Sequence, residues 1–265
     1  EETGKTLVSS PLISTVLVGA TAIVQLGNET QKQDLLPKIV AGELLTALAL
    51  DEHTSHNPSK IATTATKVDG GYALNGSKTF VLDGHIANVL IVAARTSGET
   101  IGEQGISLFL VDANAEGLNV VRTIMVDSRN SSNIQFNNVV VAEDALLGEL
   151  DQGFNGLDSV LDIARIGIAA EMLGSMQAVF ESILEFLKQR EQFGVLIGSF
   201  QGLQHRAAEM YSEIELCKSA VRAALAGLDD PDTTQAERAE LASMTKAKLS
   251  EVFFLVSNEG IQMHG

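Results

Sequence analysis

The hydrophobic pattern of residues 1–44 is that of helices. An apolar run over Pro11–Leu26 predicts a buried core helix, because it is shorter than the roughly 20 residues that a membrane span needs. A second helix is predicted from Thr30 to about Ile39, capped by Asn28 or by its own first residue. Pro37 lies late in this helix and is expected to bend or end it.

Residues 45–142 change to the short period of β-strands. Apolar or alternating runs lie at 45–50, 62–68, 72–74, 78–82, 88–94, 106–111 and 133–141. A turn is expected at Asp69-Gly70-Gly71, and Asn75-Gly76 predicts a tight hairpin because both of its residues tolerate a positive φ. Short strands at this spacing, with no helical period between them, are typical of an antiparallel barrel or sandwich.

Residues 151–265 return to a helical period. Long helices are predicted over 156–190 and 200–228. After an Asp-rich break, Thr234 and Glu237 form a capping box that opens a third helix. Helices of this length are typical of a helical bundle, within one chain or across subunits.

The order of these stretches predicts the α+β fold class. The expected domains are N-terminal helices over 1–44, a middle β-domain over 45–150 and a C-terminal helical bundle over 151–265. The sequence shows neither an internal repeat nor a low-complexity tract.

Charge and cysteine usage narrow the function. The 265 residues carry 18 Lys and Arg against 34 Asp and Glu, a formal net charge of −16, which excludes general nucleic-acid binding because so negative a field repels phosphate backbones. A CoA or nucleotide ligand would need local Arg or Lys acting against that field. The single cysteine, Cys217, is expected in the core, and the start of the chain does not read as a signal peptide. A cytoplasmic protein without a membrane span is therefore expected.

Common catalytic motifs are missing from the sequence. The five histidines form neither His-x-x-x-His nor His-Glu-x-x-His, so a zinc hydrolase is not indicated. His53 and His56 share a loop with Glu52, and solvent exposure is the preferred interpretation over a metal site. Neither a Gly-x-Ser-x-Gly elbow, nor a Walker loop, nor a Rossmann glycine pattern after a strand occurs.

One pattern is specific. Arg190-Glu-Gln-Phe-Gly194 is followed at fixed spacing by Phe200-Gln201 and by Gln204. This Arg-x-x-Phe-Gly and Phe-Gln-x-x-Gln pattern resembles the acyl-CoA dehydrogenase family. Further segments that resemble the family lie over nearly the whole chain, at 31–43, 74–79, 136–141, 147–149, 162–165 and, as a glutamine-containing turn, 260–265.

The resemblance implies a flavoprotein with an N-terminal helical domain, a central β-domain and a C-terminal four-helix domain. Such proteins assemble as homo- or hetero-oligomers, usually a tetramer built as a dimer of dimers. They bind FAD between subunits and oxidise the α–β bond of an acyl-CoA thioester, with FAD supplying the difficult chemistry and the protein supplying position and electrostatics. An electron-transfer flavoprotein is the expected electron acceptor. Compared with the family, the chain looks short at both ends.

The resemblance also assigns site residues. Arg190 is expected to reach the FAD phosphates of a neighbouring subunit, since a guanidinium binds phosphate oxygens bidentately. Asp162 and Arg165, three apart on one helix face, are expected to contact the acyl-CoA. Asn57 is a further expected substrate contact, and no metal site is expected. The other expected cofactor-binding residues are Asp51, Phe80, Val81, Leu82, Gln192, Phe193, Phe200, Gln201, Gln262 and Gly265.

The chain departs from the family pattern in the flavin loop. Where the family has Thr-Glu-Pro-x-x-Gly-Ser-Asp, residues 51–58 read Asp-Glu-His-Thr-Ser-His-Asn-Pro, and only Glu52 is retained. The family's threonine hydroxyl can donate to the flavin ring, whereas an ionised Asp51 cannot donate at all. The family's Trp-Ile-Thr is here Phe80-Val81-Leu82, which replaces a hydroxyl near flavin N5 by an apolar side chain.

The catalytic base is also not visible. In the family's reaction a glutamate removes the α proton while the β hydride goes to flavin N5. In most members this glutamate lies downstream of the glutamine motif, which here means beyond Gly265. In a minority it lies on the first bundle helix, where this chain has Ala164.

Two hypotheses follow. The preferred one is an active FAD-dependent acyl-CoA dehydrogenase, and the alternative is a non-catalytic subunit of a hetero-oligomeric dehydrogenase. The altered loop, Phe80-Val81-Leu82 and the segment 126–129 favour the alternative, while Arg190 and Gln201 favour a retained role in holding FAD. The length of the acyl chain cannot be read from the sequence, because one methylene changes binding by only about 1–3 kcal/mol.

Overall fold

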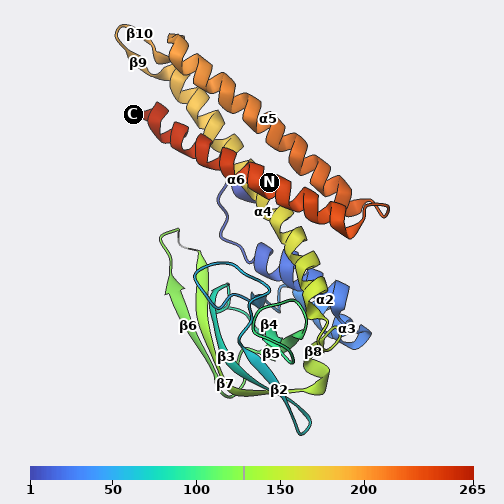
Figure 1. The fold of residues 1–265 in the computed structure, drawn as a ribbon. Helices are drawn as coiled ribbons and strands as arrows, with labels where there is room; N and C mark the ends of the chain where they lie inside the picture. Colours follow the sequence, from blue (N-terminus) through green and yellow to red (C-terminus); the bar gives the residue numbers. More distant parts are fainter. Residues whose placement is uncertain (128) are drawn as a thin grey trace. The chain divides into compact units, whose positions relative to one another are not determined.

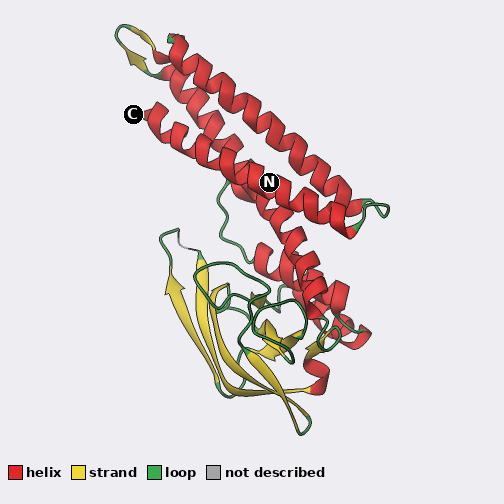
Figure 2. Cartoon of the chain, in the orientation of Figure 1, coloured by secondary structure: helices red, strands yellow, loops and turns green. Residues whose placement is uncertain are grey.

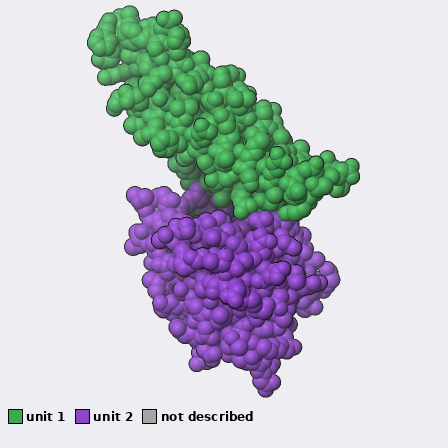
Figure 3. All heavy atoms as spheres, viewed as in Figure 1, with its two compact units in different colours: residues 1–9, 162–265 green, residues 10–161 purple. Residues whose placement is uncertain are grey.

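The computed structural model describes residues 1–127 and 129–265, so Ser128 of the segment 126–129 lies outside the described residues. The chain forms two compact units, coloured separately in Figure 3. Unit 1 combines Glu1–Ser9 with Asp162–Gly265, and unit 2 is Ser10–Leu161. The division into three domains at residues 44 and 150 stays a prediction.

Unit 2 begins with the predicted apolar helix. The first part of this helix is the π-helix η1 (Leu12–Ala20), and the second is α2 (Thr21–Leu26). The helix lies directly on strand β1 (Thr46–Ala49), since a Cβ on Gly19 would come within 1.7 Å of the Thr46 hydroxyl oxygen. The helical prediction is therefore confirmed, although the wider π geometry cannot be told from an apolar run alone.

The second predicted helix, α3 (Glu29–Val40), begins at a reciprocal cap. The Gln31 N–H donates to the Asn28 side chain at 2.9 Å, and the Asn28 N–H donates to the Gln31 side chain at 3.0 Å. Asn28, one of the two residues predicted to cap this helix, is therefore confirmed as its cap. Pro37 lies inside α3, which continues to Val40, three residues further on.

The rest of unit 2 is a sheet (Figure 1), which within the described residues has eight strands in the order β6-β7-β3-β2-β4-β5-β8, with β1 beside β4. Neighbouring strands in the sheet pair antiparallel, except that β4 pairs parallel with β1 and with β2. The predicted β-domain is confirmed, and β6 is a strand that the sequence analysis missed. The remaining bounds are β2 Thr64–Val68, β3 Gly71–Leu82, β4 Val89–Arg95, β5 Ile106–Asp112, β6 Leu118–Ile124, β7 Asn130–Ala142, the short 3₁₀-helix η2 Glu143–Ala145, and β8 Leu146–Leu147.

The predicted hairpin at Asn75-Gly76 is wrong, because β3 runs straight through both residues. The chain turns earlier, at Gly70, whose φ is +75°. Gly76 has a φ of +147° and lies at a shift in the β3–β7 register. A Cβ at this position would come within 2.5 Å of the Thr63 hydroxyl oxygen. The glycine therefore permits a close approach at a bulge rather than a turn.

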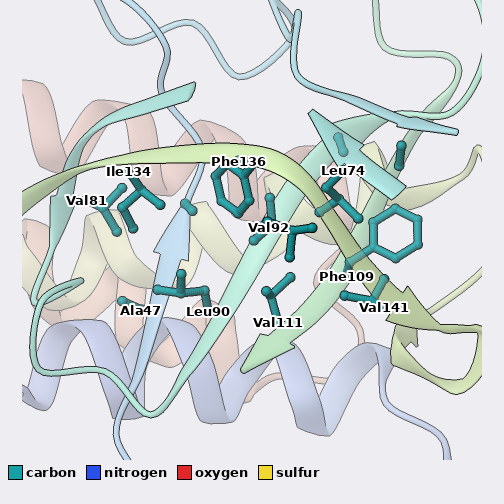
Figure 4. Packing of buried hydrophobic residues seen from close by; sticks show 14 of the residues in the cluster. Ala47, Leu74, Val81, Leu90, Val92, Phe109, Val111, Ile134, Phe136 and Val141 are labelled. Atoms are coloured by element: carbon teal, nitrogen blue, oxygen red, sulfur yellow. The ribbon is translucent and has the colours of Figure 1, made fainter. Parts of the chain in front are cut away.

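One hydrophobic core of unit 2 lies among the strands of this sheet, as Figure 4 shows, and a separate apolar cluster gathers around Ile23, Leu35 and Leu44. The side chains come from strands far apart in the sequence, and the Tyr72 and Phe109 rings lie 5.0 Å apart between centroids. Each fully buried large apolar side chain contributes about 1.5–3 kcal/mol relative to an exposed one. The residues labelled in Figure 4 are Ala47, Leu74, Val81, Leu90, Val92, Phe109, Val111, Ile134, Phe136 and Val141.

The C-terminal part of the chain is a bundle of long helices, drawn red in Figure 2. The predicted helices correspond to α4 (Gly153–Gln189), α5 (Gln201–Asp229) and α6 (Gln235–His264), and α6 opens with the predicted Thr234–Glu237 capping box. Unit 1 also holds the short α1 (Glu2–Lys5).

Helix α4 is long and apolar enough to cross a membrane by length and composition alone. Part of its apolar surface packs on the other two long helices, where Met176 and Ile183 share a core with Ile214 and Val252. Cys217 is buried in the same core, as expected, and burial raises the pKa of its thiol to about 11. The expected lack of a membrane span stays a prediction.

One buried ion pair links the sheet to the loop that precedes β2. Lys78, in β3, is fully buried, and its ammonium donates to the Leu50 carbonyl at 2.9 Å and to the Glu52 carboxylate at 2.8 Å. The Glu52 carboxylate also accepts the N–H groups of Ala62 at 2.7 Å and Thr63 at 2.9 Å. Both charges are thus hydrogen-bonded, as buried ions must be.

Replacing Lys78 by methionine is expected to lower the free energy of unfolding by about 3–5 kcal/mol at pH 7, because Glu52 keeps its charge in the interior without a counter-ion. Urea unfolding followed by circular dichroism measures the change. The matched double variant Lys78→Met/Glu52→Gln is expected to recover part of the loss. A single variant as stable as the unmodified chain would contradict this account of the pair.

Lys78 also predicts a dependence of stability on pH. Burial lowers the pKa of Lys78 from 10.5 to about 8, against the opposing pull of Glu52. Between these values the unfolded chain holds one more proton than the folded chain at this site, so its contribution to stability rises with pH. The stability difference between the unmodified chain and Lys78→Met is therefore expected to widen from pH 8 to pH 10. A difference that stays constant over this range would rule out the shift.

Candidate functional site

The loop over residues 51–58 is fixed at its start to β3. The backbone N–H of Thr79 donates to the Asp51 carbonyl at 2.7 Å, and the Thr79 hydroxyl donates to the His53 carbonyl at 3.3 Å. Glu52, between them, is held by Lys78. The loop therefore begins on a rigid part of the sheet, next to the Phe80 segment.

Glu52 has a structural role in this arrangement. Burial raises the pKa of its carboxyl, but the charge of Lys78 and the hydrogen bonds from Lys78 and Thr63 outweigh burial and hold that pKa below its usual value. Its side chain is 5 % exposed, and both of its oxygens are occupied. Glu52, the residue of the family's loop pattern that this chain keeps, is thus fully engaged within the chain.

Asp51 turns its carboxylate back into the loop. Its two oxygens lie 3.1 and 3.0 Å from Nδ1 of His56, and Oδ1 also accepts the N–H of Asn57 at 3.4 Å. The sequence analysis placed His56 in solvent. The structure confirms that the His56 side chain is exposed, at 52 %, and adds that it pairs with Asp51. An aspartate five residues before a histidine in a short loop is the signal that would have indicated this pair.

The Phe80-Val81-Leu82 segment presents its three side chains differently. Phe80 has a positive φ of +53° and a ring 59 % exposed, and its N–H donates to the Asn133 side chain at 3.2 Å. Val81 is buried in the sheet core, so its side chain is not available to a ligand. Leu82 is half buried.

In unit 1, the Arg190 segment forms a tight hairpin directly after α4. The Arg190 carbonyl accepts the N–H of Ile197 at 2.9 Å, which closes the base of the turn. Strands β9 (Glu191–Gln192) and β10 (Val195–Leu196) pair antiparallel. Phe193 and Gly194 form the tip, with φ values of +56° and +80°. The glycine of the Arg-x-x-Phe-Gly pattern is therefore explained by its backbone conformation.

The hairpin folds beside the N-terminus of α5. Phe193 is 92 % exposed, and its ring meets that of Phe200 edge-on at 6.1 Å. Phe200 caps α5 without a side-chain hydrogen bond. Its carbonyl accepts the Leu203 N–H at 3.0 Å, so the donors left at this end of the helix are the N–H groups of Gln201 and Gly202. A Cβ on Gly202 would meet nothing within 4 Å, which leaves this end of the helix open.

Asp162 and Arg165 form the predicted pair on α4. The Arg165 guanidinium donates to the Asp162 carboxylate at 2.5 Å, and the two side chains are 29 % and 2 % exposed. Ala164 is buried and carries no proton acceptor. Gln262 lies inside α6, which continues to His264, so the segment expected to be a turn is helical as far as its last residue but one.

The structure thus groups the expected site residues in two sets. Unit 2 holds Asp51, Asn57 and the 80–82 segment around one loop. Unit 1 holds the Asp162–Arg165 pair on α4, the hairpin at 190–197 with the start of α5, and the end of α6. Among the described residues, no cluster of three His, Cys, Asp or Glu side chains has the arrangement of a metal site.

The residues of the hairpin suit the phosphates of FAD. Arg190 is exposed and always charged, and its side chain forms no hydrogen bond or ion pair within the part of the chain that the structure describes. The N-terminus of α5 adds backbone donors. The loop of unit 2 suits the flavin ring less well, because Asp51 offers a carboxylate already engaged by His56 where the family offers a hydroxyl donor.

Comparison with known proteins agrees with this geometry. Residues 47–139 match the model of the acyl-CoA dehydrogenase middle domain, and residues 151–265 match that of the acyl-CoA dehydrogenase C-terminal domain. An acyl-CoA dehydrogenase of Bacillus subtilis (strain 168) is 34 % identical over 252 residues, which are 94 % of this chain and 65 % of the relative. The short-chain specific acyl-CoA dehydrogenase of Megasphaera elsdenii is 32 % identical over 263 residues, 97 % of this chain and 67 % of that one.

Solved structures show the same fold. The butyryl-CoA dehydrogenase of Megasphaera elsdenii superposes with a TM-score of 0.89 and 31 % identity, covering 99 % of this chain and 68 % of that one. An FAD complex of PigA superposes with a TM-score of 0.88 and 27 % identity, covering 96 % and 66 %. The chain spans about half to two thirds of the length of the relatives it matches. It belongs to the acyl-CoA dehydrogenase family of FAD-binding flavoproteins.

Proposed function

We propose that the chain takes part in the FAD-dependent oxidation of the α–β bond of an acyl-CoA thioester to the enoyl-CoA. The observation that carries this proposal is the hairpin after α4, in which an exposed arginine stands beside the open N-terminus of α5. In a chain of net charge −16, this is a local cation placed with backbone donors, as an anionic dinucleotide requires.

Each group of residues has a part in the proposed site. Arg190, with Gln192 and Phe193, would hold the phosphates of FAD, and Phe200 and Gln201 would lie at its adenosine end. The end of α6, at Gln262 and Gly265, would lie against the same FAD. The flavin ring would lie near Phe80, Leu82, the backbone of Val81, and the loop that begins at Asp51. Asn57, Asp162 and Arg165 would contact the acyl-CoA.

FAD, when bound, supplies the hydride acceptor, and the chain's own residues bind and orient. Arg165 suits the CoA end because its guanidinium is already oriented by Asp162, so less side-chain freedom is lost on binding. Phe80 suits a flat ring because its aromatic side chain is exposed and its backbone is fixed by Asn133.

A second function is favoured by one observation. Asp51 stands where the family has a hydroxyl donor, and its carboxylate is engaged within the loop by His56. A loop that gives the flavin ring fewer donors suits a non-catalytic subunit of a hetero-oligomeric dehydrogenase, which helps to hold FAD that reacts in a partner's site.

The assembly and location are part of the proposal. A homo- or hetero-oligomer built as a dimer of dimers would bring Arg190 of one subunit to the FAD of another. An electron-transfer flavoprotein would accept the electrons, and the cytoplasm would be the compartment.

One experiment distinguishes the active dehydrogenase from the non-catalytic subunit. The purified chain, loaded with FAD and kept without oxygen, is mixed with butyryl-CoA or isovaleryl-CoA while flavin absorbance is followed. An active dehydrogenase is expected to bleach the flavin with at least one of the two probes. A chain that binds no flavin alone but gains it with a partner subunit is the result expected of the non-catalytic subunit. A chain that binds neither FAD nor acyl-CoA under any of these conditions contradicts both.

Arg190→Ala is expected to weaken FAD binding by about 10- to 100-fold, because a charged hydrogen bond is worth about 1.5–3 kcal/mol. The FAD affinity of Arg190→Lys is expected to lie between those of Arg190→Ala and the unmodified chain, since lysine keeps the charge but loses the bidentate geometry. The matched control is Arg222→Ala, which removes an exposed arginine that lies on α5, away from the hairpin in the sequence. This variant is expected to bind FAD as the unmodified chain does. Equal dissociation constants for Arg190→Ala and Arg222→Ala would refute the assignment.

A further inference from the structure

The carboxylate of Asp51 is held in one place by its own loop. Its two oxygens lie 3.1 and 3.0 Å from Nδ1 of His56, and the Asn57 N–H donates to Oδ1 at 3.4 Å. A carboxylate only accepts hydrogen bonds, so Nδ1 carries the proton, and a neutral ring orients the carboxylate without cancelling its charge. The Asp51 side chain is 26 % exposed, so salt and water screen this charge less than at an open surface.

This charge lies beside the segment expected to contact the flavin ring. The Asp51 carbonyl accepts the Thr79 N–H at 2.7 Å, and Thr79 immediately precedes Phe80. Phe80 is the exposed aromatic residue that the proposed site places against the flavin. The backbone contact therefore fixes a carboxylate next to the place proposed for the ring.

The hydrogen-bond donors around Asp51 are already in use. The Lys78 ammonium is fully buried and bound to Glu52 at 2.8 Å. The Thr79 hydroxyl donates to a carbonyl of the loop at 3.3 Å, and the Phe80 N–H donates to a side chain of β7 at 3.2 Å. These donors are engaged within the chain, and the charge of Lys78 is matched by Glu52, so the negative charge of Asp51 remains.

A fixed negative charge beside a flavin opposes the reduction of the ring. Two electrons and one proton convert FAD to the FADH⁻ anion, which carries one more negative charge, and charges near the ring nitrogens tune this equilibrium. We propose that Asp51 lowers the reduction potential of FAD bound beside this loop. The inference rests on the proposed function, because it takes the flavin ring to lie at the loop. Asp51 thereby favours oxidised FAD and makes the reduced cofactor a stronger electron donor.

The potential can be measured apart from catalysis. FAD bound to the chain, or to its complex with a partner subunit, is reduced stepwise with dithionite without oxygen, and its absorbance is compared with that of a reference dye. A pH of about 8 keeps an ordinary imidazole neutral. Asp51→Asn is expected to raise the ratio of reduced to oxidised FAD about tenfold at a given state of the dye, which is roughly 30 mV for a two-electron couple. Asparagine keeps an oxygen that can accept from His56 and Asn57.

A second aspartate of unit 2 provides the matched control. Asp69→Asn removes an exposed carboxylate at the turn before β3, the opposite end of that strand from Thr79, and is expected to leave the potential unchanged. Asp51→Glu keeps the charge and is expected to keep a potential close to that of the unmodified chain. Asp51→Thr removes the charge and adds a hydroxyl donor, so it is expected to raise the potential at least as much as Asp51→Asn.

Equal potentials in Asp51→Asn and Asp69→Asn overturn the inference. A rise in Asp51→Thr without a rise in Asp51→Asn also overturns it, because a hydroxyl donor rather than the charge would then set the potential. If Asp51→Asn loses its FAD, the same comparison is made between Asp51→Thr and Asp51→Glu, which differ by the same charge, and equal potentials in these two overturn the inference.

The outcomes also separate this inference from the proposed function. If butyryl-CoA or isovaleryl-CoA bleaches the flavin while the potential ignores Asp51, the proposed function stands and the inference fails. If the potential depends on Asp51 while neither acyl-CoA probe bleaches the flavin, the inference stands and the proposed oxidation fails. A chain that binds no FAD, alone or with a partner subunit, overturns both.

Discussion

A single buried ion pair determines where the loop over residues 51–58 lies. Lys78 is fully buried in a β-strand, and an ammonium there must find acceptors. It finds them in the Leu50 carbonyl and the Glu52 carboxylate, and Glu52 in turn accepts two backbone N–H groups from the segment that leads into β2. The pair therefore ties the start of the loop, and the segment that follows it, to the sheet.

A second buried cation holds the later part of the same segment. The Arg95 guanidinium is 7 % exposed and donates to backbone carbonyls alone, among them those of Ser59 and Ile61. It also reaches the carbonyls of Thr100, Gly102 and Gln104. Lys78 is paired with a carboxylate, and Arg95 is surrounded by backbone carbonyls. Because both cations bind the segment 50–63, this segment has little conformational freedom. Such a loop can present side chains with fixed geometry, which the binding of a ligand requires.

The sequence predicted the parts of the fold that are set by neighbouring residues. The capping boxes at Asn28 and Thr234 involve side chains three residues from the groups they bind, and both helices begin where the pattern places them. Asn75-Gly76 failed as a hairpin because Gly76 is required by the approach of Thr63, a contact that local turn preferences do not contain. Strand β6 was missed because it is an edge strand, with only Leu118 and Val120 packed partly on the core.

The site shows the same limit. The Arg190 hairpin could be expected from its motif, because the turn itself needs the glycine. The partners of Glu52 and Asp51 could not be expected from the sequence. Lys78, the partner of Glu52, comes from a strand 26 residues away, and His56 pairs with Asp51 only once the loop is closed.

The central claim is that the loop of unit 2 and the hairpin of unit 1 both bind FAD. Hydrogen–deuterium exchange of the chain with and without FAD, followed by mass spectrometry, tests both segments at once. Slower exchange in 51–63 and in 190–204, with the far end of the bundle near residues 229–234 unchanged, is the predicted result. FAD that binds without changing exchange in either segment would contradict it.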